Sequence, residues 1–204
     1  MDRAGLRRKW LKAQAKAGDI VLLFADASEA LTHPDRAHVW AQKGVDLRIP
    51  APGQSAKVAM LGVLDGRRRT LIVRTSRTKR SLIVRTSRTK RRSDFIALLE
   101  EVDRRYAPKF GVALTPMVLG LDNGPIHTSK ASRAALAQRA HWLRVEWLPK
   151  YAPELNHIEG VWRDLKRHHL AHPTFTAPDD LKGAIQEVVI KLNTQPSRHP
   201  CANQ

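Results

Sequence analysis

Residues 57–75 read KVAMLGVLDGRRRTLIVRT, two apolar runs separated by a short polar segment. The runs at 57–65 and 70–75 are rich in aliphatic and β-branched residues, and the dipeptide Asp65-Gly66 between them favours a turn. This stretch therefore predicts two strands joined as a β-hairpin. An earlier run, DIVLLFAD at 19–26, is short, apolar and bounded by polar residues, which is typical of a buried strand.

Outward from the hairpin, the apolar periodicity predicts further elements on both sides. Residues 1–18 read as a short basic helix that ends at Gly18, and 27–55 read as irregular. Downstream, strands are expected at 115–122 and 144–148, and helices at 93–106 (capped by Ser93), 129–140 (capped by Ser129 or Thr128), 154–170 and 178–193. This order predicts an α/β domain over 19–193, a mixed sheet flanked by helices in the ribonuclease H-like order, followed by a loose tail at 194–204.

A tandem repeat interrupts the hairpin region. LIVRTSRTKR occurs at 71–80 and again at 82–91, with a period of 11 residues. A solenoid needs more copies than two, so this identity indicates a recent duplication. We therefore expect residues 82–92 to be an insertion that lengthens the hairpin, slips a strand or forms a loop. Two identical strands offer two registers for one place in the sheet.

Composition narrows the class of partner. The 204 residues include 36 Lys and Arg against 19 Asp and Glu, a net charge of +17, which points to an anionic partner such as nucleic acid. A single cysteine, Cys201, excludes a disulfide framework and a cysteine-built metal site. The longest apolar runs are about six residues, too short to span a membrane. With no secretory signal at the start, we expect a soluble, cytoplasmic, nucleoid-associated protein.

Three acidic residues are expected to meet at one edge of the sheet. Asp26 ends the first predicted strand, Asp122 ends the fourth, and Glu159 lies early in the helix at 154–170. Ligand sites in open α/β sheets gather beyond the carboxyl ends of strands. Carboxylates packed closely repel one another unless a cation is present, and Mg²⁺ prefers such oxygen ligands. The alternative is that 122–125 (DNGP) is only a turn and Glu159 only a solvent-facing residue.

The blocks around these acids resemble a known family. LDNGPIHTS (121–129) is followed by LPKYAPELNHIEGVWRDLK (148–166), and FADASEALTHPDRAHVWAQKG (24–44) precedes both. Together they resemble the DDE transposases of bacterial insertion sequences in the mariner superfamily, over most of 19–193. Two positions depart from the family pattern: Ala27 stands where the family usually has Glu, and His157 where it usually has Pro.

The resemblance implies a catalytic core that binds two Mg²⁺ or Mn²⁺ ions through Asp26, Asp122 and Glu159. Asp122 and Glu159 are 37 positions apart, close to the usual interval of the family. The implied reaction is hydrolysis of a phosphodiester at the ends of an insertion sequence, followed by attack of the freed 3′-hydroxyl on target DNA. The implied partners are transposon-end DNA and target DNA.

Other residues are expected to support this site. Asn123 and Asn156 are predicted as supporting residues, with Asn156 either supporting Glu159 or capping the start of its helix. His127 either contacts a bound phosphate, orients its loop, or is a hydrogen-bonded structural histidine. Trp147 and Trp162 are expected in the core. The histidines at 168, 169 and 172 are expected at the surface, because neighbouring residues on a helix diverge by about 100°.

A basic segment at 67–92 is the predicted DNA-binding surface. It holds 12 Lys or Arg residues and no acid, and each phosphate that it neutralises adds roughly one unit to the salt dependence of duplex binding. Such contacts position DNA without reading its sequence. The alternative is a solvated basic hairpin. The residues are Arg67, Arg68, Arg69, Arg74, Arg77, Lys79, Arg80, Arg85, Arg88, Lys90, Arg91 and Arg92.

Three functions remain open at this point: a metal-dependent transposase core, an inactive remnant that only binds DNA, and a ribonuclease H-like nuclease. Only about 18 residues precede the first predicted strand, too few for a domain that reads transposon ends. We therefore expect an amino-terminally truncated catalytic part, with a homodimer and a separate helix-turn-helix polypeptide among its candidate partners.

Deletion of residues 82–92 tests the duplication. If these residues are an insertion, the shortened protein keeps its fold and its melting temperature is unchanged or raised, because one of two competing strand registers has been removed. Thermal unfolding followed by circular dichroism measures this. A lower melting temperature after the deletion would show that the second copy is part of the folded sheet.

Overall fold

The described part of the chain folds as one sheet with helices on both faces. A computed structural model describes residues 3–33, 42–45, 54–66, 70–77, 92–111, 115–149, 156–171 and 173–194. The strands are β1 (Val21–Leu31), β2 (Lys57–Asp65), β3 (Thr70–Arg77), β4 (Met117–Leu121) and β5 (Leu143–Trp147). The helices are α1 (Arg3–Ala17), α2 (Arg92–Tyr106), α3 (Pro125–Thr128), α4 (Lys130–Ala137), α5 (Ile158–Asp164), the π-helical turn η2 (Leu165–His169) and α6 (Pro178–Thr194).

The sheet has the order β3-β2-β1-β4-β5 and mixes both strand directions. β1, β2 and β3 form an antiparallel meander, whereas β4 and β5 run parallel to β1. Only Val21–Phe24 of β1 pair with β4, so β1 continues past the end of β4 with β2 as its neighbour. This step in the sheet places the second half of β1 beside the loop that follows β4.

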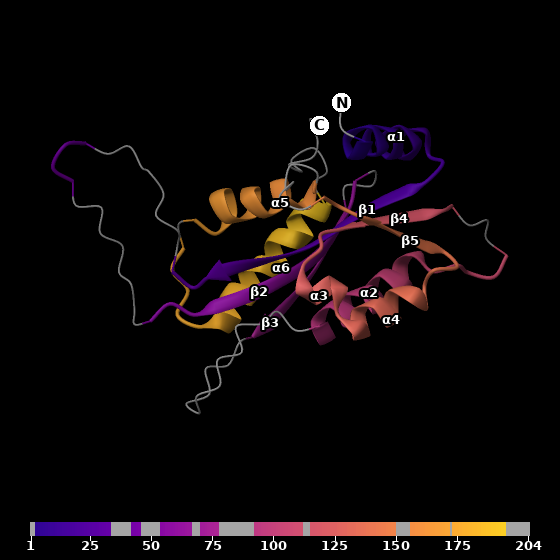
Figure 1. Cartoon of the computed structure of the whole chain (residues 1–204). Coiled ribbons are helices and arrows are strands. Elements are labelled where there is room, and N and C mark those ends of the chain that lie inside the picture. The colour runs from indigo at the N-terminus through magenta and orange to yellow at the C-terminus, as the bar shows by residue number, and fades with distance from the viewer. Residues whose placement is uncertain are drawn as a thin grey trace.

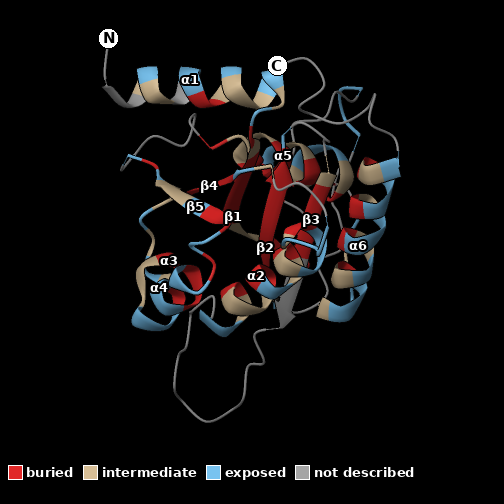
Figure 2. Ribbon diagram, turned by 90° about the vertical axis from the view of Figure 1, so that its right-hand side faces the viewer, coloured by how far each residue is buried: buried red, intermediate tan, exposed pale blue. Residues whose placement is uncertain are grey.

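Two apolar layers hold the helices to the sheet. α5, α6 and α1 lie on one face, and α2, α3 and α4 lie on the other (Figure 1). The strand residues alternate between these layers: Phe24 faces α5, and Leu23 faces α2. The central strands are buried along most of their described length (Figure 2). We therefore confirm the α/β sheet flanked by helices that the sequence predicts.

Three local predictions from the sequence are confirmed: a helix end, a hairpin and a helix cap. Gly18 has a φ of 93° directly after α1, a left-handed conformation that favours glycine at the end of a helix. The predicted hairpin is present as β2 and β3, with Asp65 opposite Thr70. Ser129 caps α4, since its hydroxyl accepts a hydrogen bond from the Ser132 backbone N–H at 3.2 Å.

Other boundaries differ from the sequence predictions. β1 runs to Leu31 instead of ending at Asp26, because Ala27–Leu31 find backbone partners on β2. The predicted Ser93 cap is wrong: Ser93 lies inside α2, which begins at Arg92. α4 ends at Ala137, and the short α3 before it begins with Pro125, whose missing N–H costs nothing in a first helical turn.

The duplicated segment is described only in part. Residues of the first copy, up to Arg77, form most of β3. The second copy lies outside the described residues, as does the start of the helix predicted from 154. Of the tail predicted at 194–204, Thr194 is instead the last residue of α6, and 195–204 lie outside the described residues. The proposal that 82–92 is an insertion therefore remains a prediction. In the described ranges, no helix has the length and apolar character needed to cross a membrane.

A side chain from α6 covers the outer edge of the sheet at β3. Asn193 accepts a hydrogen bond from the Leu71 N–H at 2.8 Å and donates one to the Leu71 carbonyl at 2.9 Å. The amide thus satisfies both backbone groups of one edge residue, as a neighbouring strand would. An edge strand otherwise presents unpaired backbone groups.

Replacement of Asn193 by Ala tests this edge contact. We expect the N193A protein to lose about 1–3 kcal/mol of unfolding free energy, because two partly buried backbone groups lose their partner. Urea unfolding measures the loss. T194A is the matched control, since the Thr194 hydroxyl bonds to carbonyls of its own helix, at Ile190 and Lys191. Equal stability of the two variants would contradict the edge contact.

Candidate active site

Asp26 lies within β1, on the face of the sheet that α5 covers. It pairs across the sheet with Gly62 of β2, and its exposed fraction is 9%. The sequence places Asp26 at the end of a strand, but in the structure the strand continues beyond it. What ends near Asp26 is β4, whose pairing with β1 stops at Phe24 and Gly120. Asp26 therefore still lies at the carboxyl end of a parallel strand, here the neighbouring one.

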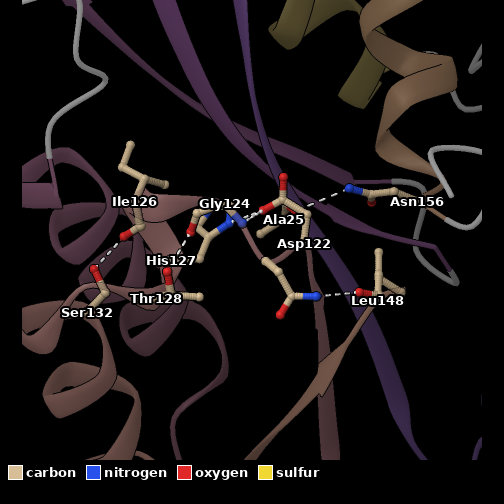
Figure 3. A network of polar contacts seen from close by, with 10 residues as sticks. Ala25, Asp122, Gly124, Ile126, His127, Thr128, Ser132, Leu148 and Asn156 are labelled. Atoms are coloured by element: carbon tan, nitrogen blue, oxygen red, sulfur yellow. Dashed lines mark hydrogen bonds and ion pairs between the residues drawn. The ribbon is translucent and has the colours of Figure 1, made fainter. Parts of the chain in front are cut away.

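Asp122 directly follows β4 and is held by its own turn. Its carboxylate accepts a hydrogen bond from the Gly124 N–H at 3.1 Å and contacts Nδ1 of His127 (Figure 3). The His127 ring is buried and packs edge-on against Phe95, with ring centroids 4.7 Å apart. The side chain of Asp122 is itself 49% exposed. A rigid, buried imidazole thus orients an accessible carboxylate, which favours the loop-orienting interpretation of His127.

Asn123 fixes the next position of the same loop. Its amide donates a hydrogen bond to the Leu148 carbonyl at 2.7 Å, and the Leu148 N–H donates to the Leu121 carbonyl at 2.8 Å. These bonds extend the contact between β4 and β5 beyond the last strand residues. The loop that carries Asp122 is therefore tied to the sheet on both sides of the carboxylate.

Glu159 lies in the first turn of α5, and Asn156 joins this turn to β1. Asn156 is buried, its side-chain NH2 donates to the Ala25 carbonyl at 3.4 Å, and its backbone carbonyl accepts from the Glu159 N–H at 3.0 Å. Figure 3 shows Asn156 reaching toward Ala25, the residue before Asp26. Asn156 does not cap α5 with its side chain, since His157 is the N-cap residue and no side-chain bond caps this helix. Its contacts link the start of α5 to the strand of Asp26, which agrees with a supporting position.

The carboxylates of Glu159 and Asp122 act electrostatically on Asp26. The pKa of Asp26 is raised from its ordinary value of 3.8 to about 6, mainly by burial and in addition by the negative charges of Glu159 and Asp122. The Ala27 backbone N–H, which bonds the carboxylate, and the nearby His127 oppose this rise. The structure therefore brings Asp26, Asp122 and Glu159 within electrostatic range from three separate elements, as the sequence predicts.

The donor set fits a hard divalent cation in an open site. Carboxylate oxygens are the ligands that Mg²⁺ prefers, and one or two suffice because waters and phosphate oxygens complete its coordination. Asn156 adds a neutral acceptor, since its buried Oδ1 has no hydrogen-bond partner in the described part of the chain. Within the same ranges, no three His, Cys, Asp or Glu side chains converge into a closed metal cage. The arrangement suits a metal that is shared with substrate.

The remaining predicted residues have mixed outcomes. Trp162 is buried as expected, but Trp147 is not a core residue: it is 39% exposed, because it is the last residue of an edge strand. His168 is exposed and pairs with Asp164 at 2.7 Å, in agreement with a surface position. His172 lies outside the described residues.

Little of the predicted DNA-binding segment is described. Arg92 is exposed at the start of α2. Arg74 and Arg77 lie on β3, at the edge of the sheet, with only their backbone described. The others lie outside the described residues: Arg67, Arg68, Arg69, Lys79, Arg80, Arg85, Arg88, Lys90 and Arg91.

The raised pKa of Asp26 predicts a stability gain on neutralisation. Below pH 3.8 the carboxyl is protonated in both states; between pH 3.8 and 6 only the unfolded chain ionises it; above pH 6 both states are ionised. Wild type therefore loses stability as the pH rises through this window. We expect D26N to be more stable at pH 8 without metal, by on the order of 2–3 kcal/mol, with no gain at pH 3.5.

Urea unfolding at several pH values measures this difference. D179N, at an exposed position paired with Lys182, is the control and should show little pH-dependent change. A D26N protein that is less stable than wild type at pH 8 would contradict the burial of an ionised Asp26.

Comparison with solved structures supports the fold described above. Three solved structures are similar to this chain at 16% sequence identity, and each match covers 98% of this chain. The Mos1 transposase paired-end complex with left transposon end has a TM-score of 0.61 with 59% of its chain covered, and the Mos1 mariner paired-end complex with Mn has a TM-score of 0.61 with 60% covered. The catalytic domain of Mos1 mariner transposase has a TM-score of 0.59 with 90% of its chain covered. These likenesses confirm the ribonuclease H-like fold. No curated protein sequence matches the chain.

The family is shown by a match along the sequence itself. The chain spans about three fifths of the first two Mos1 chains and nine tenths of the Mos1 catalytic domain. Residues 21–182 match the family model described as DDE superfamily endonuclease, from the start of β1 into α6 and across Asp26, Asp122 and Glu159. The chain belongs to the DDE superfamily endonuclease family.

Proposed function

We propose that this chain is the catalytic core of a transposase, which cleaves DNA strands at insertion-sequence ends and transfers them to target DNA. The proposal rests mainly on one observation: burial, together with the charges of Glu159 on α5 and Asp122 after β4, raises the pKa of Asp26 on β1. A fold gains no stability from such crowding, so the arrangement suits cation binding. Membership of an endonuclease family supports the same conclusion.

The proposed reaction has two displacements at phosphorus. In the first, a water oxygen attacks the phosphodiester, the bond to the leaving 3′-oxygen breaks, and a 3′-hydroxyl is freed. In the second, this hydroxyl attacks a phosphodiester of target DNA, whose own 3′-oxygen leaves. When bound, two Mg²⁺ or Mn²⁺ ions supply activation of the attacking oxygen and charge stabilisation at the leaving oxygen.

The side chains of this chain hold and orient the reacting groups. Asp26, Asp122 and Glu159 would hold the cations. His127 keeps the Asp122 carboxylate in one orientation, because its own ring is fixed against Phe95. Asn156 ties the first turn of α5 to the strand of Asp26. Such preorganised groups lower the barrier because they need no rearrangement when charge develops.

DNA contact is proposed for the basic segment 67–92. Its 12 cations and the net charge of +17 support binding to the phosphate backbone, and Arg92 presents an exposed side chain at the start of α2. The likeness to a Mos1 complex with a left transposon end supports transposon-end DNA as the partner. We also propose that the chain forms a homodimer, acts together with a separate helix-turn-helix polypeptide and associates with the nucleoid.

Plasmid nicking tests the function directly. We expect the purified chain to nick supercoiled plasmid with Mg²⁺ or Mn²⁺ and not with EDTA. Asp122→Asn should lower the rate at least ~100-fold, because one of the groups that binds the cation and orients the reaction is lost. E159Q should act in the same way. D179N, an acid-to-amide change on α6, is the matched control and should cleave like wild type.

The outcomes separate the three candidate functions. Cleavage that persists in EDTA would contradict the carboxylate site. DNA binding with no cleavage under any divalent metal would identify a remnant that only binds DNA. Cleavage without joining of the freed 3′ end to a second DNA would favour a nuclease over a transposase.

A further inference from the structure

Two glycines flank Asp26 on the neighbouring strands, and an aromatic ring lies over each. Gly62 of β2 and Gly120 of β4 pair with Asp26 and Phe24 respectively. A Cβ atom at Gly62 would lie 2.6 Å from Cη2 of Trp162, and one at Gly120 would lie 3.1 Å from Cδ1 of Phe24. Both rings therefore fill space that any other residue would occupy.

These rings connect the sheet to α5 on both sides of Glu159. Trp162 belongs to α5 and lies three residues after Glu159, nearly one helical turn. The His157 ring, two residues before Glu159, packs on Phe24 with centroids 4.9 Å apart. α5 is thus seated on β1 and β2 through contacts before and after Glu159 in the sequence.

The contact at Gly62 has little freedom to adjust. Trp162 is 1% exposed and packs in the apolar layer between the sheet and α5. A Cβ at position 62 would also lie 2.8 Å from Cζ2 of Trp162 and 3.1 Å from the Ile72 carbonyl of β3. The backbone carbonyl is fixed by sheet pairing, so the indole must move, and α5 with it.

We infer that Gly62 and Trp162 are positioning residues that set the separation of Glu159 from Asp26, and through it the affinity of the site for a divalent cation. This inference rests on the proposed function. Gly62 supplies the space directly opposite Asp26, and the indole that fills it fixes how closely α5 approaches β1. Neither residue touches the reacting atoms.

The test combines a steric change with its relief. In G62A the new methyl group pushes the indole outward, whereas W162F removes Cζ2 and Cη2, the atoms that the methyl group meets. We expect G62A to bind Mn²⁺ roughly tenfold more weakly, since small displacements at a site have large effects. The double variant G62A/W162F should recover wild-type affinity to within about threefold, as expected for coupled neighbours.

Mn²⁺ binding is measured without DNA, from the electron paramagnetic resonance signal of the free ion, and plasmid nicking is measured at saturating Mn²⁺. G183A is the control, because a Cβ there meets nothing within 4 Å. Melting temperatures show which variants are folded. If G62A does not fold, the double variant carries the test through its recovery of both folding and Mn²⁺ affinity.

The results distinguish two kinds of failure. Wild-type Mn²⁺ affinity and nicking in folded G62A would overturn the positioning role and leave the proposed function intact. A double variant that regains its melting temperature but not its Mn²⁺ affinity would also overturn it. A wild-type protein that neither binds Mn²⁺ nor nicks DNA would overturn the proposed function together with the inference.

Discussion

Repulsion between carboxylates is the constraint on which this site depends. Asp26 is almost enclosed by protein, and two further acids raise its pKa beyond the effect of burial. Without a cation, an ionised Asp26 costs free energy that the rest of the domain must offset. The cost is located where the antiparallel and parallel halves of the sheet meet, which is also where the loop after β4 and the start of α5 converge.

Packing on the two faces of the sheet supplies the resistance to this repulsion. On one face, the buried His127 holds Asp122 and is itself held by Phe95 of α2. On the other, Trp162 lies over Gly62 and the His157 ring packs on Phe24, so α5 is held close to β1. Asp122 and the helix of Glu159 are thus anchored through neighbours that pack against an apolar layer.

Local signals in the sequence predict much of this fold. The hairpin at 57–75 is predicted from its apolar runs and turn dipeptide, and the last helix from its periodicity, because both depend on near neighbours. The extension of β1 to Leu31 could not be predicted, since DASEA has no strong apolar alternation and is a strand only through its pairing with β2. The exposure of Trp147 follows from its place on an edge strand, which only the strand order reveals.

In the candidate site too, some residues are predictable from the sequence and others depend on contacts between distant segments. The blocks at 24–44, 121–129 and 148–166 predict Asp26, Asp122 and Glu159 as site residues. Of the two predicted strand ends, that at Asp122 is correct, whereas β1 continues past Asp26. The contact of Gly62 with Trp162 could not be predicted, because the two residues are 100 positions apart and a glycine inside a strand carries only a weak signal of close approach. The importance of this glycine becomes clear only from the strand pairing, which places Gly62 opposite Asp26.

The most direct measurement is the anomalous diffraction of a crystal grown with Mn²⁺. We expect a manganese peak in contact with carboxylate oxygens of Asp26 and of at least one of Asp122 and Glu159. A crystal in which manganese binds only elsewhere, or in which these three side chains point away from one another, would contradict it.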